Sequence, residues 1–406
     1  MKFAHLADVH IGSWRDPKLK DISTRAFVKA VDECIRSRVD FVLLAGDLFN
    51  TAVPGIEFIK TVVSKLKELS NSNIPVYGIP GSHDFSASGK TMLDVLEEAG
   101  LFVNVFRGNV DKTSKKLSLK FTVDRKTGAK ITGIIGKRGM LDRKLYESLD
   151  AAALENEPGF KIFLFHTAIA EIHPEIAQFA ECATLSLLPK GFDYYAGGHI
   201  HQRYEKNHAG HGMITLPGAL FPCNFPELEK HSRGGFFIVE DNRIDWHPVQ
   251  VFNTHHISVN CSNKTVREVE DELFSHIKDK EFIATIVTIR LSGHLASGKV
   301  SDINFRDIYA RLYAKSAHFV MKNTHSVTSD EFEEAESRTD AVEDVEHEII
   351  ESNAGQIALE GVTIENEKEI IRQLLTILDD ERDEGEKVGD FEKRILEEAK
   401  AVLNIG

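Results

Sequence analysis

The sequence predicts an α/β fold, because strand-like and helix-like segments alternate through its first third and metal-capable side chains recur where the strand-like segments end. The chain has 406 residues, 42% of them hydrophobic, which is enough for two or three modest domains. No apolar run approaches the roughly 20 residues that span a bilayer. The first apolar run, Lys2–Val9, also lacks the charged leader and cleavage site of a signal peptide. We therefore expect no membrane-spanning segment.

The hydrophobic pattern of the first 240 residues defines each expected element. Continuous apolar runs predict buried strands, and apolar residues at helical spacing predict helices. The expected strands are Lys2–Val9, Asp40–Phe49, Ile74–Ile79, Phe160–Phe165, Phe192–Ala196, Met213–Leu216 and Gly235–Glu240. The expected helices are Thr24–Arg36, Ile56–Leu69 and Thr91–Ala99. This order is typical of a sheet with helices packed on its faces.

The pattern changes near Phe252, where a second set of elements begins. The expected β-α-β-α-β order consists of His255–Asn260, Thr265–Ile277, Glu281–Leu291, Asp302–Ala314 and Ala317–Met321. This set is long enough to form a small second domain.

The negative charge of the chain is concentrated in its last part. Ser329–Gly406 holds 25 of the 63 acidic residues and 8 of the 49 basic ones, which leaves 38 acidic and 41 basic residues in 1–328. The formal net charge of −14 therefore belongs to the tail, and the body can still bind a polyanion, especially if it holds divalent cations. Because Thr324–Glu365 is also poor in aromatic residues, it is expected to be a solvated linker.

Two amphipathic stripes follow the linker. They consist of Ile370, Ile371, Leu374, Leu375 and Leu378, and of Phe391, Ile395, Leu396, Ala399 and Leu403. Two helices of about 15 residues cannot bury both stripes by themselves. Either they pack back on the body or they dock onto another protein, and we favour docking because the linker lets them reach away from the body.

The four cysteines, Cys34, Cys182, Cys223 and Cys261, lie far apart and form no Cys-x-x-Cys pair. This spacing argues against both a disulfide scaffold and a thiolate zinc site. We expect four reduced thiols in a cytosolic protein.

Five expected strands end in residues that can bind metals. These residues are Asp8, His10, Asp47, Ser82, His83, Asp84, His166, His199 and His201. One histidine at a strand end is more often a hydrogen-bonded core residue than a ligand, but five such ends are far less expected by chance. Residues i and i+2 share a face of a strand, so Asp8 with His10, and His199 with His201, could each reach one ion. If the last residues leave the strand, only their proximity in sequence supports the pairing.

The chemistry of this set favours a pair of transition-metal ions. Carboxylate oxygens and imidazole nitrogens without cysteine suit Mn²⁺, Fe²⁺ or Zn²⁺ better than Ca²⁺. A carboxylate on a central strand can bridge two ions about 3.5–4 Å apart, and such a pair grips a phosphoryl group and activates water.

The blocks DxH, GD, GSHD, H and GHIH, in this order, resemble the five-block signature of the calcineurin-like metallophosphoesterases over about residues 1–250. ADVHIG, LLAGDLFNTAVP and FDYYAGGHIHQRY further resemble the SbcD-type nucleases of DNA double-strand-break repair, in their archaeal and eukaryotic-like branch. The resemblance implies a metallophosphoesterase β-sandwich flanked by helices, a small α+β capping domain and a C-terminal helix pair. The implied domains are 1–254 (nuclease), 255–323 (DNA cap), 324–365 (linker) and 366–406 (docking module for an SbcC-like coiled-coil ATPase).

The resemblance also implies roles for single residues. Asp8, His10 and His201 would hold one Mn²⁺, Asp47 would bridge to a second, and His166 and His199 would help to hold that second ion. His83 would contact the scissile phosphate and act as general acid, with Asp84 orienting its ring. The expected activities are 3′–5′ exonuclease and single-strand or hairpin endonuclease. The family further implies a homodimer, and we expect helix Ile56–Leu69 or helix Thr91–Ala99 at its interface. It also implies that the protein is located in the cytoplasm, at the nucleoid.

Two positions depart from the family pattern. Ser82 replaces the usual asparagine ligand of the second metal, and its shorter, weaker hydroxyl donor predicts a looser second site. Asn50 stands where relatives commonly carry a histidine near the phosphate, and it can donate a hydrogen bond but cannot shuttle a proton. Both departures bear on rate and metal preference.

Three functions remain open at this point. The first is a Mn²⁺-dependent nuclease, the second a catalytically weakened DNA-binding scaffold, and the third a phosphatase for nucleotides or small esters. The cap and the docking helices argue against the third, because small substrates need neither. A basic stretch around an expected hairpin is either a solvated face or a row of DNA phosphate contacts: Lys112, Lys115, Lys116, Lys120, Arg125, Lys126 and Lys130.

Overall fold

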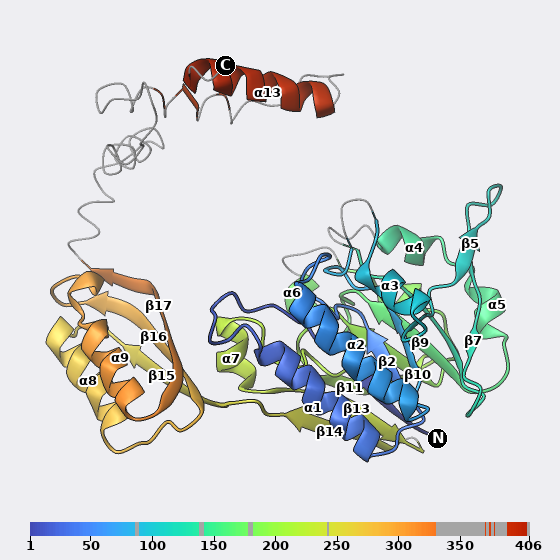
Figure 1. Cartoon of the computed structure of the whole chain (residues 1–406), viewed down its shortest axis with the longest axis horizontal. Coiled ribbons are helices and arrows are strands. Elements are labelled where there is room, and N and C mark those ends of the chain that lie inside the picture. The colour runs from blue at the N-terminus through green and yellow to red at the C-terminus, as the bar shows by residue number, and fades with distance from the viewer. Residues whose placement is uncertain are drawn as a thin grey trace. The chain divides into compact units, whose positions relative to one another are not determined.

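Two six-stranded sheets form the centre of the fold (Figure 1). The computed structural model describes residues 1–85, 89–137, 142–177, 182–241 and 243–329, and beyond these the helical positions 370, 373, 374, 377 and 388–403. The first sheet contains, in spatial order, β14 (Arg243–Val249), β13 (Gly234–Glu240), β1 (Lys2–Leu6), β2 (Phe41–Ala45), β3 (Val76–Ile79) and β4 (Val103–Asn104). Strands β1 to β4 are parallel, whereas β13 runs antiparallel to β1.

The second sheet has the same number of strands and a parallel centre. Its spatial order is β11 (Tyr204–His208), β12 (Gly212–Leu216), β10 (Tyr194–Gly198), β9 (Lys161–His166), β8 (Lys130–Ile134) and β7 (Thr122–Val123). Only the edge strands β11 and β7 pair antiparallel. A two-stranded hairpin, β5 (Gly108–Val110) with β6 (Leu117–Leu119), precedes β7.

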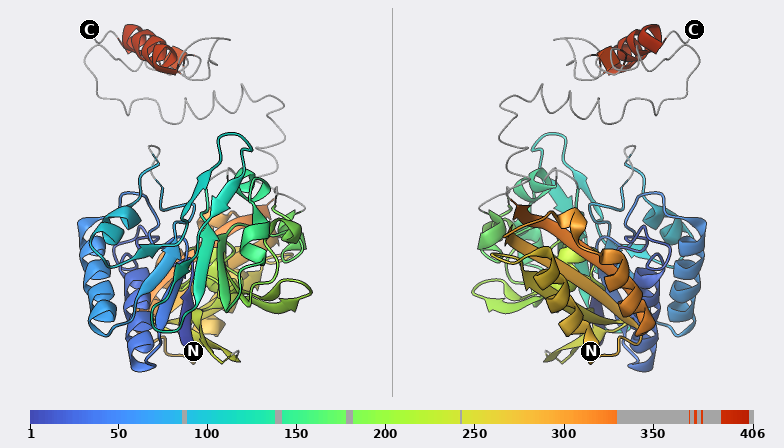
Figure 2. Two further views of the ribbon diagram at one scale, coloured as in Figure 1. Left: turned by 90° about the vertical axis from the view of Figure 1, so that its right-hand side faces the viewer. Right: turned by 90° about the vertical axis from the view of Figure 1, so that its left-hand side faces the viewer.

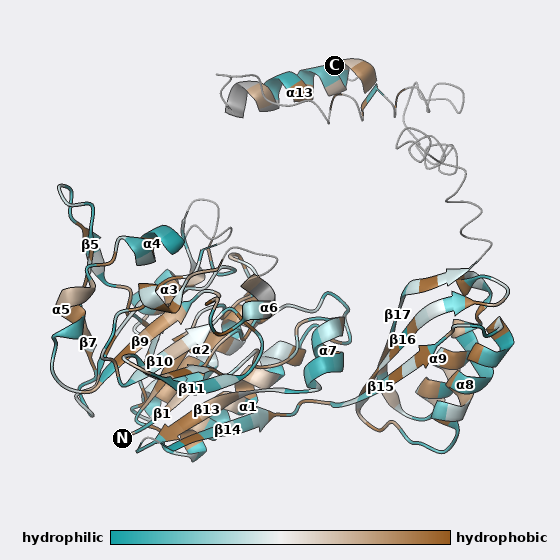
Figure 3. Cartoon of the chain, turned by 180° about the vertical axis from the view of Figure 1, so that it is seen from behind, coloured by the Kyte–Doolittle hydropathy of each residue, from teal (hydrophilic) through white to brown (hydrophobic). Residues whose placement is uncertain are grey.

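The alternation of side chains along the central strands explains the sandwich. Phe3 on β1, Leu43 on β2 and Leu164 on β9 belong to one buried cluster between the two sheets. Their neighbours Ala4 and Leu44 point to the opposite face and pack with residues of the helices. Because both faces of these strands are covered, they are continuous apolar runs rather than alternating ones. Figure 3 shows this hydrophobic character as brown colour on β9 and β13.

Helices cover the outer faces of the sandwich (Figure 2). Phe27 on α1, Val62 on α2 and Leu93 on α3 lie in the cluster on the outer face of the first sheet. The helices of this part are α1 (Ile22–Arg36), α2 (Ile56–Asn71), α3 (Met92–Glu98), α4 (Arg143–Glu147), α5 (Ala151–Glu155), α6 (Pro174–Ala177) and α7 (Phe225–His231). The predicted sandwich with flanking helices is therefore confirmed.

The second set of elements also follows the predicted order. A three-stranded sheet consists of β15, β16 and β17, and two helices connect its strands; the bounds are β15 (Asn253–Asn260), α8 (Val266–Lys278), β16 (Thr285–Leu295), α9 (Phe305–Ala314) and β17 (Ala317–Ser329). The expected end of the last strand at Met321 is wrong. β17 continues to Ser329 and so includes the first residues assigned to the linker, because backbone pairing continues after the apolar pattern stops.

The C-terminal part is described only in pieces. The second expected helix is confirmed as α13 (Val388–Leu403), with Leu396 exposed on it. Of the first stripe, Ile370 and Leu374 are helical, whereas Ile371, Leu375 and Leu378 lie outside the described residues. So does the linker from residue 330 to 365. Within the described ranges, no helix combines the length and the apolarity that a bilayer crossing requires.

The buried His5 on β1 makes the stability of the fold depend on pH. Its Nδ1 lies 3.0 Å from the Tyr194 hydroxyl and 3.2 Å from Thr215 Oγ1, and its side chain is fully buried. Burial lowers the pKa of His5 to about 3. Because a histidine in an unfolded chain titrates near pH about 6.5, the unfolded state binds a proton between these values that the folded state does not. The neutral, buried His5 therefore contributes to the free energy of unfolding. This contribution is complete above pH about 6.5 and is lost as the pH falls toward 3.

We expect His5→Gln to reduce this acid sensitivity, because glutamine keeps a hydrogen-bonding group that cannot titrate. Urea unfolding at pH values of about 7.5 and 5.0 measures the loss of free energy for both proteins. The loss is expected to be smaller in the variant by about 2 kcal/mol. Equal losses in the two proteins would show that His5 does not carry the effect.

Candidate metal centre

The ends of five parallel strands from both sheets converge on one site. Asp8 and His10 follow β1, Asp47 follows β2, Ser82 and His83 follow β3, His166 is the last residue of β9, and His199 and His201 follow β10. All the predicted metal ligands therefore come from the same type of strand end.

The pairing of side chains along a strand does not explain this convergence. β1 ends at Leu6, and β10 ends at Gly198, so Asp8, His10, His199 and His201 all lie in loops. The expectation that each pair shares a strand face is wrong, because the apolar run that follows Leu6 is buried loop and not strand.

These loops use backbone conformations that ordinary residues avoid. The φ angles of Asp8, His10, Asp47 and His199 are 48°, 45°, 51° and 85°. Hydrogen bonds from Asp8 N to Gly46 O (3.2 Å) and from His10 N to Asp47 O (3.0 Å) hold two of the loops together. Left-handed conformations of non-glycine residues cost about 1–3 kcal/mol each and cluster at functional sites. Four of them here indicate that side-chain placement outweighs local backbone preference.

Glycines let the loops approach one another closely. A Cβ atom on Gly46 would lie 2.1 Å from His166 Nδ1, and one on Gly81 would lie 2.2 Å from Asp47 Oδ1. Any larger residue at these positions would displace a side chain of the site.

Asp47 is at the centre of the cluster. Its Oδ2 lies 3.2 Å from His166 Nε2, 3.3 Å from Ser82 Oγ and 3.6 Å from His10 Nε2. Its Oδ1 accepts a hydrogen bond of 2.7 Å from the backbone of His83. The Asp47 carboxylate is therefore surrounded by side chains that were expected to hold metal ions.

Asp8 occupies a second central position. Its Oδ1 accepts a hydrogen bond of 2.9 Å from the backbone of His199, and lies 3.8 Å from His201 Nε2 and 4.0 Å from His166 Nδ1. The ring of His199 packs against that of His166, with centroids 5.2 Å apart. Asp8 therefore contacts residues that were expected to bind different ions.

Burial and neighbouring charges shift the pKa values of the carboxylates and of His166 in the cluster. Burial raises the pKa of the fully enclosed Asp8. Burial acts the same way on Asp47, but the neighbouring His166 outweighs it and holds the pKa of Asp47 below its usual range. Burial opposes a charge on His166 as well, yet the Asp47 carboxylate raises the pKa of His166 to about 10. The protein alone thus places a proton on His166, where a cation would supply the positive charge instead.

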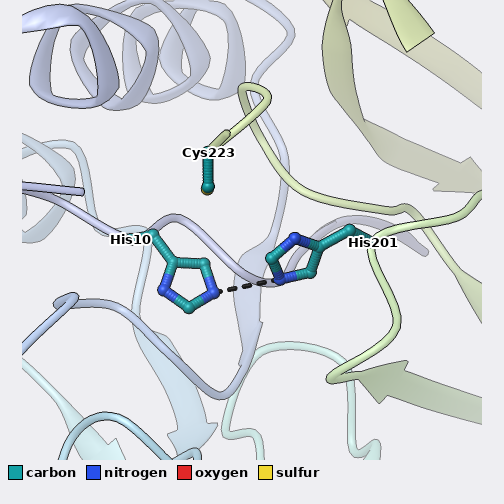
Figure 4. Close-up of side chains that lie close together, drawn as sticks. All are labelled: His10, His201 and Cys223. Carbon is teal, nitrogen blue, oxygen red and sulfur yellow. Dashed lines mark hydrogen bonds between the residues drawn. The ribbon is translucent and has the colours of Figure 1, made fainter. Parts of the chain in front are cut away.

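Imidazole nitrogens that face one another and Asp47 support a metal at this site. His166 Nδ1 donates to Ala45 O (2.8 Å), and its other nitrogen, Nε2, lies 3.2 Å from Asp47 Oδ2. His10 Nε2 and His201 Nε2 face each other at 3.1 Å (Figure 4). Among the residues that the structure describes, three groups of side chains offer donor atoms within 4.8 Å of one another: Asp8, Asp47 and His166; His10, Asp47 and His83; and His10, His201 and Cys223. This oxygen- and nitrogen-rich set fits a pair of divalent transition metals.

The contacts of His83 and Asp84 differ from the prediction. His83 Nδ1 lies 3.0 Å from Asn50 O, which can only accept, so Nδ1 carries the hydrogen. Asp84 instead accepts from the backbone of Phe49 (3.1 Å) and Gly81 (2.9 Å). The role assigned to Asp84, orienting the His83 ring, is therefore corrected: Asp84 fixes the two loops, and the main chain of Asn50 orients the ring. Burial raises the pKa of Asp84 to about 7.

Two residues of the site were missed in the sequence. Glu227 on α7 accepts from His201 Nδ1 at 2.9 Å, and Cys223, just before α7, joins His10 and His201. A histidine ligand whose second nitrogen is held by a carboxylate is common in metal sites. His208, the last residue of β11, and His211 belong to none of these donor groups.

Glu227 should control metal affinity through His201. We expect Glu227→Gln to weaken Mn²⁺ binding about 10–100-fold, because the carboxylate fixes the ring and increases its basicity. Calorimetric titration of the metal-free protein measures the affinity. Glu229→Gln is the matched control, because Glu229 lies on the same helix but pairs with Arg290 (2.6 Å). Equal affinities of the Glu227→Gln variant and the unchanged protein would contradict this role.

Comparison with known proteins agrees with the geometry. The chain is similar to proteins named DNA double-strand break repair protein Mre11. It is 28% identical to the Methanopyrus kandleri protein, and the match covers 64% of this chain and 59% of that relative. It is also 28% identical to the Archaeoglobus fulgidus protein, and this match covers 69% of this chain and 64% of that relative. The relative from Methanococcus maripaludis is 28% identical over 77% of this chain and 79% of its own length. The matches thus span less than two thirds of the first two relatives.

The family model described as calcineurin-like phosphoesterase matches residues 1–203, half of the 406-residue chain. This range includes all five strands whose ends build the site. The chain therefore belongs to the calcineurin-like phosphoesterase family.

Proposed function

We propose that the protein is a Mn²⁺-dependent DNA phosphodiesterase that processes double-strand breaks, as exonuclease and as single-strand or hairpin endonuclease. The observation that carries this proposal is the convergence of two buried carboxylates and four histidine rings beside His83. The similarity to relatives named as DNA double-strand break repair proteins supports DNA as the substrate.

Two Mn²⁺ ions per chain fit the donors. Asp8, His10 and His201 would hold the first ion, Asp47 would bridge, and His166, His199 and Ser82 would hold the second. The ions, when bound, supply positive charge to the scissile phosphate and activate water for attack. Ser82 Oγ lies 3.3 Å from Asp47 Oδ2, which supports its proposed role as a weak ligand.

His83 is the proposed general acid. Since its Nδ1–H is held by the Asn50 carbonyl, Nε2 is the atom available to deliver a proton to the leaving oxygen. Asp84 supports this arrangement indirectly, by fixing the loop that carries His83. The side-chain amide of Asn50 is proposed to donate a hydrogen bond to the phosphate.

The second candidate function is a DNA-binding scaffold with a weakened catalytic site. It is favoured by Ser82 and Asn50, which replace the asparagine and histidine that the family commonly carries there. The intact set of other ligands favours the enzyme.

The β5–β6 hairpin is a candidate DNA-contacting surface. Lys126 and Lys130 pair with Asp40 and Glu157, so their charges are balanced within the protein. Lys112, Lys115 and Lys116 at the hairpin turn are exposed, and their charge is available to DNA phosphates.

The proposed partners use other surfaces. α13 carries the apolar residues Phe391, Ile395 and Leu396 and is proposed to dock onto an SbcC-like ATPase. Val53, Ile56 and Val95 are exposed near α2 and on α3, which supports these helices as the homodimer interface. The proposed location is the cytoplasm, at the nucleoid.

We expect His83→Ala to abolish cleavage while metal binding is retained, because His83 delivers a proton and is not among the proposed ligands. The assay uses chelator-treated protein, linear duplex DNA and added Mn²⁺, with and without the ATPase partner. General acid catalysis contributes about 10²–10⁴-fold, so any residual turnover should be lower by at least that factor. His208→Ala, at the end of β11, should keep full activity. Unchanged cleavage by the His83→Ala variant would contradict the role of His83 as general acid. If the unchanged protein showed no metal-dependent cleavage, the proposed nuclease activity itself would be contradicted.

We expect replacement of Lys112, Lys115 and Lys116 by glutamine to weaken duplex DNA binding at low salt and to make it less salt-dependent. Each lost phosphate contact reduces the slope of log affinity against log salt by about 0.9. Fluorescence anisotropy across a salt series measures both quantities, with sequence-unrelated duplexes expected to respond equally. An unchanged slope would mean that the hairpin is only a solvated face.

A further inference from the structure

We propose that Cys223 is an additional ligand of the first metal ion and gives this site a preference for thiophilic cations such as Zn²⁺ and Cd²⁺. This inference rests on the metal centre of the proposed function. It adds a sulfur donor to a site that the sequence pattern describes with oxygen and nitrogen alone.

The position of Cys223 carries the inference. Its Sγ and one ring nitrogen each of His10 and His201 lie within 4.8 Å of one another. Figure 4 shows the thiol beside the two facing imidazole rings. Of the four cysteines, Cys223 alone belongs to a group of potential metal ligands in the described ranges.

The loop that carries Cys223 is held in place by three hydrogen bonds. Leu220 N donates to Asp8 O (3.2 Å), the Trp14 indole donates to Pro222 O (3.1 Å), and Cys223 N donates to Glu227 Oε2 (2.8 Å). The thiol is therefore placed by the same strand end and the same helix that place the metal-binding histidines.

Glu227 connects the thiol with the metal centre. One of its carboxylate oxygens accepts from His201 Nδ1, and the other accepts from the backbone of Cys223. A single side chain thus fixes both the imidazole and the loop of the sulfur donor. This is the arrangement expected of residues that bind one ion together.

Coordination requires only a local change at Cys223. In the protein alone, Sγ donates a hydrogen bond of 3.3 Å to Phe221 O. On binding an ion, Sγ gives up this contact and releases its proton to solvent, because the thiolate is the ligand form. Thiolates favour soft and borderline metals, whereas Mn²⁺ prefers oxygen donors. The sulfur should therefore strengthen binding of Zn²⁺ and Cd²⁺ much more than binding of Mn²⁺.

Cobalt spectroscopy tests the proposed Co–S bond directly. Co²⁺ added to the metal-free full-length protein should produce a near-ultraviolet thiolate-to-cobalt band that Cys223→Ser and Cys223→Ala lack. Cys182→Ser is the matched control and should retain the band. Cobalt binding with no such band in the unchanged protein would overturn the role of Cys223 but not the metal centre. No cobalt binding at all would overturn both.

Competition with a chelator measures the preference itself. Cys223→Ser should lower the affinity for the more tightly bound Cd²⁺ ion by about tenfold or more. It should change the affinity for Mn²⁺ by less than about twofold. Circular dichroism and thermal unfolding of the variants establish that they fold. Equal losses for both metals in folded Cys223→Ser and Cys223→Ala, or no loss for Cd²⁺, would contradict the proposal.

Discussion

The structure depends on the burial of two carboxylates at one place. Asp8 is 0% and Asp47 is 2% exposed, and the basic side chains that pair with them are histidines rather than lysine or arginine. Burying like charges so close together is unfavourable unless positive charge balances them. Histidine protonation provides part of this charge in the protein alone, and divalent cations would provide it completely. The fold keeps this site, whose negative charge is only partly balanced by the protein alone, intact.

The β-sandwich provides the rigidity that such a site needs. Residues of the site come from the ends of strands in both sheets, and the cluster of Phe3, Leu43 and Leu164 holds the two sheets together. The strands stop short of the site, and left-handed loops complete the approach. Asp47, with φ of 51°, illustrates the outcome: its backbone is unfavourable locally, while its carboxylate meets His166, Ser82 and His10. Local strain and loop glycines are therefore part of how the centre is built.

Much of the fold could be predicted because burial on both faces makes central strands easy to recognise. The strand ends could not, since Val9 and Phe49 are as apolar and buried as strand residues but lie in loops around the site. The residues proposed as ligands could be located in the sequence because their order and strand context are specific. Glu227 and Cys223 were not, because they meet His201 only through the fold. The interaction of Asp84 with backbone amides likewise depends on how two loops meet, which no spacing in the sequence encodes.

The number of divalent cations per chain tests the central claim most directly. After chelator treatment and dialysis against Mn²⁺, elemental analysis of the full-length protein should find about two ions per chain, since two buried carboxylates and the surrounding histidines provide donors for a bridged pair. A value near one or zero would contradict the proposed dimetal centre and would favour a DNA-binding scaffold.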